Sequence, residues 1–134
     1  LFQAEYLKIH KRTLFKLGQK FSFPTVLWSA DTCSGAAYGG HLEVLQWLRQ
    51  EGCPWDEWTC WSAAHYGHLE VLQWARQNGC PWDEETCTHA AYGGQLEVLQ
   101  WARQNGCPWN AGTFVRADSH CRPYLIEHGC PGAR

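Results

Sequence analysis

A repeat with a period of 27 residues runs through this chain and restricts the folds open to it. The segment GCPWDEWTCWSAAHYGHLEVLQWARQNG, residues 52–79, recurs as GCPWDEETCTHAAYGGQLEVLQWARQNG at residues 79–106. A fixed period of this size is typical of a solenoid, in which each unit buries its apolar face only against its neighbours. Columns of identical residues extend the frame in both directions: Trp28, Trp55, Trp82 and Trp109, and Thr32, Thr59, Thr86 and Thr113.

One unit has the local signals of two short helices. Asp56 is placed as the N-cap of the first helix, since its carboxylate can accept hydrogen bonds from the free amides of the first turn. This helix is expected over residues 57–66 and is expected to stop at Gly67, which can adopt the left-handed conformation. The second helix is expected over residues 69–76, where apolar residues recur at helical spacing, with Gly79 after its end. The pattern therefore predicts an all-α fold.

The motif that joins the two helices carries a resemblance. Residues 63–72, AAHYGHLEVL, followed by Gly79 and Cys80, resemble the AAxxGHLEVVxxLLxxGA core of the ankyrin repeat. The family's unit has about 33 residues, and about six are missing here between Gly52 and Thr59, where the family builds a β-hairpin finger. The resemblance implies a helical-repeat solenoid of ankyrin-like helix-turn-helix units, with a non-enzymatic function and no cofactor.

The repeat frame divides a single domain, residues 1–134, into units. Apolar positions of the frame survive in the N-terminal segment while the motif does not, as expected for a capping repeat with one face in water. The last unit is shortened between Thr113 and Gly129, and Pro123 fits the first turn of its second helix. The expected units are an N-terminal cap repeat at 1–27, regular repeats at 28–54, 55–81 and 82–108, and a shortened C-terminal cap repeat at 109–134.

Charge is distributed unevenly along the chain. Residues 1–20 carry a net charge of +4, whereas residues 21–134 carry −6. An acidic solenoid of this kind is expected to be a poor nucleic-acid binder along its length, because the phosphate backbone is itself negative, and we expect no nucleic-acid partner. The basic segment has two interpretations: a second contact site for an acidic partner or a phosphate, or, the favoured one, the solvated face of a capping repeat.

Membrane and targeting signals are not visible in the sequence. No apolar run approaches the ~20 residues that a membrane span needs, so no membrane association is expected. The chain starts at Leu1 and contains no methionine, so we expect a fragment or a processed form, in which a missing targeting signal means little. The module is expected to be monomeric or part of a larger chain or complex.

Eight cysteines recur mainly at two positions of the repeat. Equivalent cysteines of neighbouring repeats would lie about 8–10 Å apart, the spacing of packed helices, which exceeds the ~7 Å between Cα atoms that a disulfide allows. The favoured interpretation is a ladder of reduced, buried thiols, which indicates an intracellular, reducing compartment such as the cytoplasm. The columns are Cys33, Cys60 and Cys87 in the first helix and Cys53, Cys80, Cys107 and Cys130 after the second, with Cys121 outside both.

Zinc is the chemical alternative, with Cys53, Cys60 and either His65 or His68 as ligands. The spacing disfavours this site, because no close CxxC pair exists and Gln95 replaces the candidate histidine in the next unit. The chain also lacks a nucleophile elbow, a Gly-rich phosphate loop after a strand and an HExxH motif. We therefore expect no metal site, no small-molecule substrate and no enzymatic activity.

Positions that vary while the frame stays constant are candidates for binding, since packing does not dictate them. The resemblance implies that residues near the start of the first helix, and the two residues after the Ala pair, face a concave surface that contacts partners. Rings fill these positions in the middle repeat, and Trp and Tyr are enriched in interface hot spots. We therefore expect a protein partner to bind a face centred on the middle repeat and formed by Tyr38, Trp58, Trp61, His65, Tyr66, Glu85 and Tyr92.

Two alternatives to this function stay open. In the first, Trp58 and Trp61 are structural: they cover neighbouring repeats and compensate for the missing β-hairpin fingers. In the second, the whole chain is a structural subunit that is permanently held in a larger assembly, with its aromatic face buried. The tryptophans that recur from unit to unit are instead expected in the core: Trp28, Trp47, Trp55, Trp74, Trp82, Trp101 and Trp109.

Overall fold

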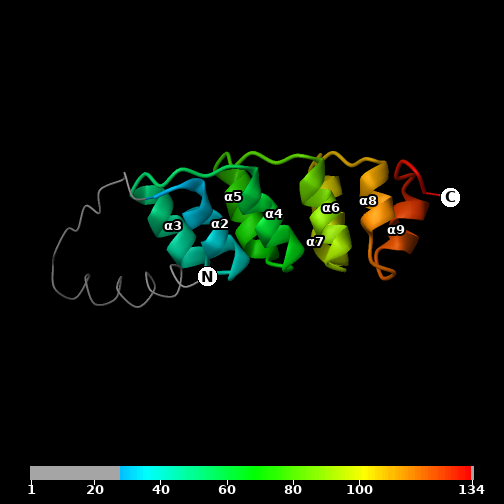
Figure 1. Ribbon diagram of the computed structural model, residues 1–134, viewed down its shortest axis with the longest axis horizontal. Helices are drawn as coiled ribbons and strands as arrows, with labels where there is room; N and C mark the ends of the chain where they lie inside the picture. Colours follow the sequence, from blue (N-terminus) through cyan, green and yellow to red (C-terminus); the bar gives the residue numbers. More distant parts are fainter. Residues whose placement is uncertain (1–27, 134) are drawn as a thin grey trace.

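The computed structural model describes residues 28–133, and the N-terminal cap repeat predicted at 1–27 lies outside them. Consecutive pairs of helices stack along one direction in this part of the chain, which contains no strand (Figure 1). None of these helices is long and apolar enough to cross a membrane. The helices are α2 (Ala30–Tyr38), α3 (Leu42–Gln50), α4 (Glu57–His65), α5 (Leu69–Gln77), α6 (Glu84–Tyr92), α7 (Leu96–Gln104), α8 (Ala111–Arg116) and α9 (Arg122–Glu127).

The helix ends follow the local signals in the sequence. Asp56 caps α4 by accepting a hydrogen bond from the amide of Trp58 at 3.0 Å. Helix α4 ends at His65, one residue before the predicted end, and Tyr66 is its C-cap. Gly67 follows with φ +75°, a left-handed conformation that costs residues with a Cβ roughly 1–2 kcal/mol. The predicted cap and the predicted stop of this helix are therefore confirmed.

The first helices of the pairs form one layer and pack directly on one another. α2 contacts α4, α4 contacts α6 and α6 contacts α8, while α3, α5 and α7 each pack against the first helix of their own pair. Ala63 and Ala64 of α4 are fully buried, because small side chains let neighbouring helices approach closely. Leu72 of α5 is also fully buried. The core is therefore a continuous row between repeats, as in other solenoids.

The recurring tryptophans lie at the margin of this core, half-buried rather than enclosed as predicted. Trp55 packs edge-on against Trp74 with 5.8 Å between ring centroids. Arg49 of the preceding repeat covers the Trp55 ring, 4.1 Å from its centroid, and donates a hydrogen bond to the carbonyl of Cys53. These cation–π contacts tie successive repeats together at the linking loops. The same arrangement recurs for Arg76 over Trp82 and for Arg103 over Trp109.

The last helix pair is shorter than the others, as the sequence predicts. Asn110 begins α8 with a capping box, in which its side chain and that of Thr113 each accept from the other residue's backbone amide. Pro123 lies in the first turn of α9, where its missing N–H costs no helical hydrogen bond. Tyr124 packs edge-on against Trp109 at 6.5 Å, so it replaces the second tryptophan of the regular repeats.

Candidate protein-interaction face

The side chains predicted to bind a partner come from three helices of the first layer. Because α2, α4 and α6 stack directly on one another, equivalent positions fall in rows across this layer. The predicted residues are Tyr38 at the end of α2; Trp58, Trp61, His65 and Tyr66 in or directly after α4; and Glu85 and Tyr92 in α6.

Rings from neighbouring repeats touch along one side of this face. Tyr38 lies against Tyr66, with 4.1 Å between ring centroids. His65 contacts Tyr66 edge-on at 4.6 Å and stacks on Tyr92 at 5.4 Å. The four rings therefore connect three successive repeats without a gap.

A second group of rings continues from His65. Trp58 lies 4.8 Å from Trp61, Trp61 stacks on His89 at 5.4 Å, and His89 reaches His65 at 5.5 Å. Six of the seven predicted residues thus belong to one contiguous set, to which the structure adds His89. This set, called the aromatic strip from here on, consists of Tyr38, Trp58, Trp61, His65, Tyr66, His89 and Tyr92.

The two tryptophans of the strip have different surroundings. Trp58 is 55% exposed, so it covers little of any neighbouring repeat. Trp61 is half-buried, and its indole Nε1 donates a hydrogen bond of 2.7 Å to Asp83 Oδ1. Asp83 also accepts from the amide of Glu85 as the N-cap of α6. Trp61 therefore helps to fix the next repeat, whereas Trp58 is free to contact a partner.

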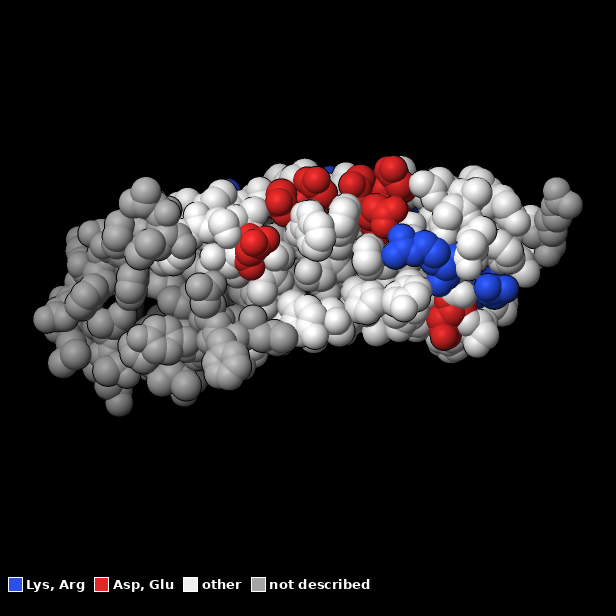
Figure 2. Space-filling view, viewed as in Figure 1, with Lys and Arg blue, Asp and Glu red and all other residues white. Residues whose placement is uncertain are grey.

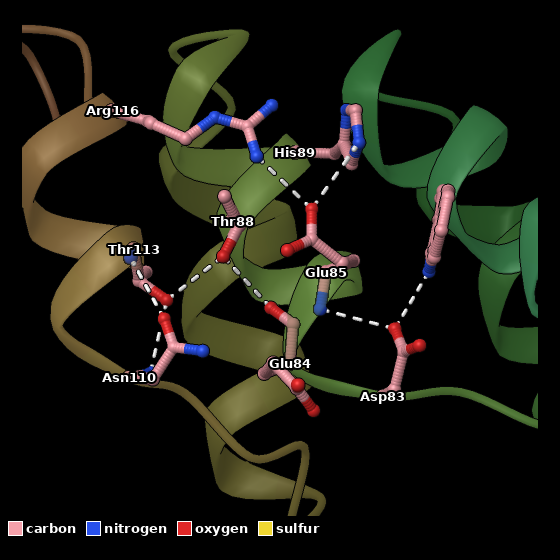
Figure 3. A network of polar contacts seen from close by, with 9 residues as sticks. Asp83, Glu84, Glu85, Thr88, His89, Asn110, Thr113 and Arg116 are labelled. Atoms are coloured by element: carbon pink, nitrogen blue, oxygen red, sulfur yellow. Dashed lines mark hydrogen bonds and ion pairs between the residues drawn. The ribbon is translucent and has the colours of Figure 1, made fainter.

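The Thr88 hydroxyl makes a polar contact in the core that the two earlier repeats lack. It bonds the hydroxyl of Thr113 at 2.9 Å (Figure 3). Trp61 and Ser34 occupy the position of Thr88 in the earlier repeats. The equivalents of Thr113 are there Thr86 and Thr59, whose buried hydroxyls have no hydrogen-bond partner within residues 28–133. A buried hydroxyl left in this way costs about 1–3 kcal/mol.

Glu85, predicted to contact a partner, is already paired inside the chain. Its Oε2 lies 3.1 Å from Nη1 of Arg116 on α8 and 3.7 Å from Nε2 of His89 (Figure 3). The Arg116 guanidinium also lies 5.8 Å from the centroid of the Tyr92 ring. Glu85 thus holds the Arg116 guanidinium and the His89 imidazole at one end of the strip rather than offering a free carboxylate.

His89 and Arg116 belong to this face but were not among the predicted residues. Both occupy a repeat position that holds Gly35 and Ser62 in the earlier units. The residue at this position differs between repeats as much as the residues of the predicted face do, so this variation could have identified it from the sequence. The ankyrin resemblance points only to the start of the first helix and to the two residues after the Ala pair. The position of His89 and Arg116 belongs to neither group.

Burial lowers the pKa of His89, and the nearby Arg116 and His65 lower it further. The unfolded chain therefore takes up a proton at this residue before the folded chain does, as the pH falls through about 6.5. We expect the free energy of unfolding to decrease below that pH, and His89→Gln to reduce the decrease. Urea unfolding at pH values above and below 6.5 measures this change, with His120→Gln at an exposed position as the control. An equal pH dependence of stability in the unchanged chain and both variants would show that His89 is not responsible.

The cysteine thiols contact each other within a repeat. The sequence analysis considered only distances between equivalent cysteines of neighbouring repeats and did not predict these contacts. Cys33 and Cys53 come from the two columns of one repeat, and their sulfur atoms lie 3.4 Å apart with the Cys33 thiol donating. Cys80 in the next repeat donates to the carbonyl of Asp56 at 3.4 Å. A hydrogen bond with the Cys80 thiol, together with burial, raises the pKa of Cys60. All eight cysteines are free and buried, which agrees with their predicted position in the core.

The residues of the alternative zinc site are divided between repeats. Cys53 contacts Cys33 in the first described repeat, whereas Cys60 interacts with Cys80 in the next. His68 Nε2 forms a hydrogen bond with the carbonyl of Tyr38 at 3.0 Å. Within residues 28–133, no group of three or more His, Cys, Asp or Glu side chains is arranged to hold a metal ion.

Stacked helix pairs with left-handed glycines between them agree with what a family comparison finds. Residues 60–103 match the family model described as ankyrin repeats (many copies). This part of the chain is therefore similar to ankyrin repeats. Ankyrin repeats are generally protein–protein interaction modules, and their family is typically non-enzymatic. The matched residues span most of the aromatic strip, from Trp61 to Tyr92. No curated protein matches the chain.

Proposed function

We propose that this chain is a non-enzymatic module that binds a protein partner through the aromatic strip. The observation that carries the proposal is a continuous row of rings across three ankyrin repeats, several of which are open to solvent. Trp58, Tyr66 and Tyr92 are 55%, 43% and 56% exposed. Large rings grouped on a surface mark interaction sites more often than rings scattered singly.

The contacts within the strip favour tight binding. Each exposed ring rests on a neighbour, as Trp58 does on Trp61 and Tyr92 on His65. Rings held in this way lose little conformational entropy when a partner covers them. Trp and Tyr side chains are the residues that most often dominate binding energy. The strip therefore combines preorganised geometry with the residue types suited to a hot spot.

The unit boundaries and the compartment belong to the same proposal. We assign one domain, residues 1–134, with regular repeats at 28–54, 55–81 and 82–108 between the two terminal units. The reduced, buried thiols support a reducing, intracellular location, because disulfides are rare there. A monodisperse isolated chain would favour a free module over a permanent structural subunit.

The test compares two baits that differ only in exposed rings. We expect Trp58→Ala combined with Tyr92→Ala to weaken binding of the partner by about 2 kcal/mol or more. Trp61 is left intact because its hydrogen bond to Asp83 serves the fold. Affinity capture from a lysate of the source cell, with quantitative mass spectrometry, finds proteins lost with the variant, and titration of those proteins measures the loss.

The matched control is Ile126→Ala, which removes an exposed apolar side chain (49%) from α9. We expect this variant to capture the same proteins as the unchanged chain, and thermal melting of all three chains to agree closely. Capture profiles that do not distinguish the ring variant from the control would reject the strip as the binding site.

A further inference from the structure

The junction between α6 and α8 contains a cation held by a carboxylate and a ring. Arg116 of α8 forms an ion pair with Glu85 at 3.1 Å, and its guanidinium faces Tyr92 at 5.8 Å from the ring centroid. An anionic side chain beside an aromatic face is a favourable site for a guanidinium, since both attract positive charge.

The same site recurs two repeats earlier without its cation. Asp31 and Tyr38 of α2 occupy the positions of Glu85 and Tyr92, but Ser62 of α4 stands where α8 has Arg116. Asp31 is exposed, and within residues 28–133 its carboxylate accepts no hydrogen bond and forms no ion pair. Tyr66 adds a second ring, 4.1 Å from that of Tyr38. The carboxylate and rings are thus present, and the described part of the chain supplies no positive charge to them.

The face around Asp31 carries more negative than positive side chains, which also favours binding of a cation. Figure 2 shows acidic side chains gathered along one edge of the stacked helices and basic ones near α8 and α9. Arg116 is the one Lys or Arg in the first-layer helices α2, α4, α6 and α8. The arginines at 49, 76 and 103 lie on the second helices of the pairs, where they cover tryptophan rings. Carboxylates at the starts of these helices are Asp31, Asp56, Glu57, Asp83, Glu84 and Glu85.

We infer that the partner inserts an Arg or Lys side chain between Asp31 and the ring pair Tyr38 and Tyr66, where it supplies the charge that Arg116 supplies at the other end. This inference rests on the proposed function, because it names the chemistry of the segment that covers the strip. A partner with apolar groups over Trp58 and a cation over Asp31 matches both the rings and the acidic edge. Complementary charge of this kind gives specificity as well as faster association.

The test uses the full chain and a random linear peptide library displayed on phage. Selected peptides are kept only if the chain with Trp58→Ala and Tyr92→Ala no longer binds them, so that each depends on the strip. We expect these peptides to contain Arg or Lys beside apolar residues. Replacing that residue by Gln in a synthetic copy is expected to weaken binding roughly three- to thirtyfold.

Two changes in the chain locate the cation. Asp31→Asn removes the carboxylate, and Ser62→Arg places a guanidinium where Arg116 lies in the last unit, so each is expected to weaken the retained peptides roughly three- to thirtyfold. The controls make the same changes of charge on exposed residues of α3, with Glu43→Gln and Gln50→Arg. We expect each control to change affinity less than about twofold, since exposed charges beyond a Debye length are screened.

The outcomes separate this inference from the proposal beneath it. Strip-dependent peptides without Arg or Lys, or equal effects of Asp31→Asn and Glu43→Gln, would overturn the cation site and leave binding by the strip in place. A library that yields no strip-dependent peptide counts against both. Thermal melting of the Asp31 and Ser62 variants shows whether a loss of binding reflects the site or the fold.

Discussion

Leu72→Ala is expected to lower the free energy of unfolding by about 2–5 kcal/mol, the range measured for large-to-small changes in protein cores. Leu72 is fully buried in α5, in the middle of the described repeats. Removing its side chain leaves a cavity in the core that the stacked repeats share, and packing of this core holds a repeat array together. Urea unfolding followed by circular dichroism measures the loss.

Leu69→Ala is the matched control for this change. Leu69 lies in the same helix but is only half-buried, so its truncation leaves a space that water can fill. We expect a clearly smaller loss than for Leu72→Ala, because the cavity contribution is absent. Equal losses of unfolding free energy at the two positions would show that the burial of Leu72 does not determine its contribution to stability.

Arg76→Ala is expected to destabilise the chain by about 1.5–3 kcal/mol, which is large for a side chain that reaches the surface. The guanidinium donates a hydrogen bond to the carbonyl of Cys80 and lies 4.2 Å from the centroid of the Trp82 ring. One side chain therefore joins the end of one repeat to the start of the next. Its loss leaves the carbonyl without this donor and uncovers the indole.

Arg76→Lys tests whether geometry or charge is responsible. An ammonium group cannot donate to the carbonyl and lie flat over the indole at the same time, so we expect Lys to recover less than half of the loss. Gln77→Ala, an exposed change in the same helix, controls for helix propensity. Full recovery by Lys would show that charge alone matters. A double-mutant cycle with Trp82→Ala then measures the coupling between ring and guanidinium.

Much of the fold could be predicted because its signals are local. The capping carboxylate of Asp56 and the left-handed Gly67 act within a few residues of their own helix. Their offsets repeat with the period of the chain, so one correctly interpreted unit predicts the others. The helix ends accordingly lie within one residue of their predicted places in the middle repeat. The candidate face could be located for the same reason, since equivalent positions in stacked helices must fall in rows.

Side-chain contacts between neighbouring helices could not be predicted in this way. The ring of Trp61 and that of Trp58 are three residues apart in one helix, yet one reaches Asp83 of the next repeat and the other remains exposed. The Cys33 and Cys53 thiols meet although they belong to different columns of the repeat. Such contacts depend on how far neighbouring helices are rotated and translated relative to each other.

The sequence by itself therefore determined the repeat, the helices and the face that carries variable side chains, because these depend on spacing along the chain. Only the tertiary structure decided which side chains of that face pair with each other. It joined His89 to the strip, paired Glu85 with Arg116, and gave Asp31 no cationic partner among residues 28–133. The physical reason is that hydrogen bonds, ion pairs and ring contacts operate over a few ångströms, a distance set by the packing of helices from different repeats.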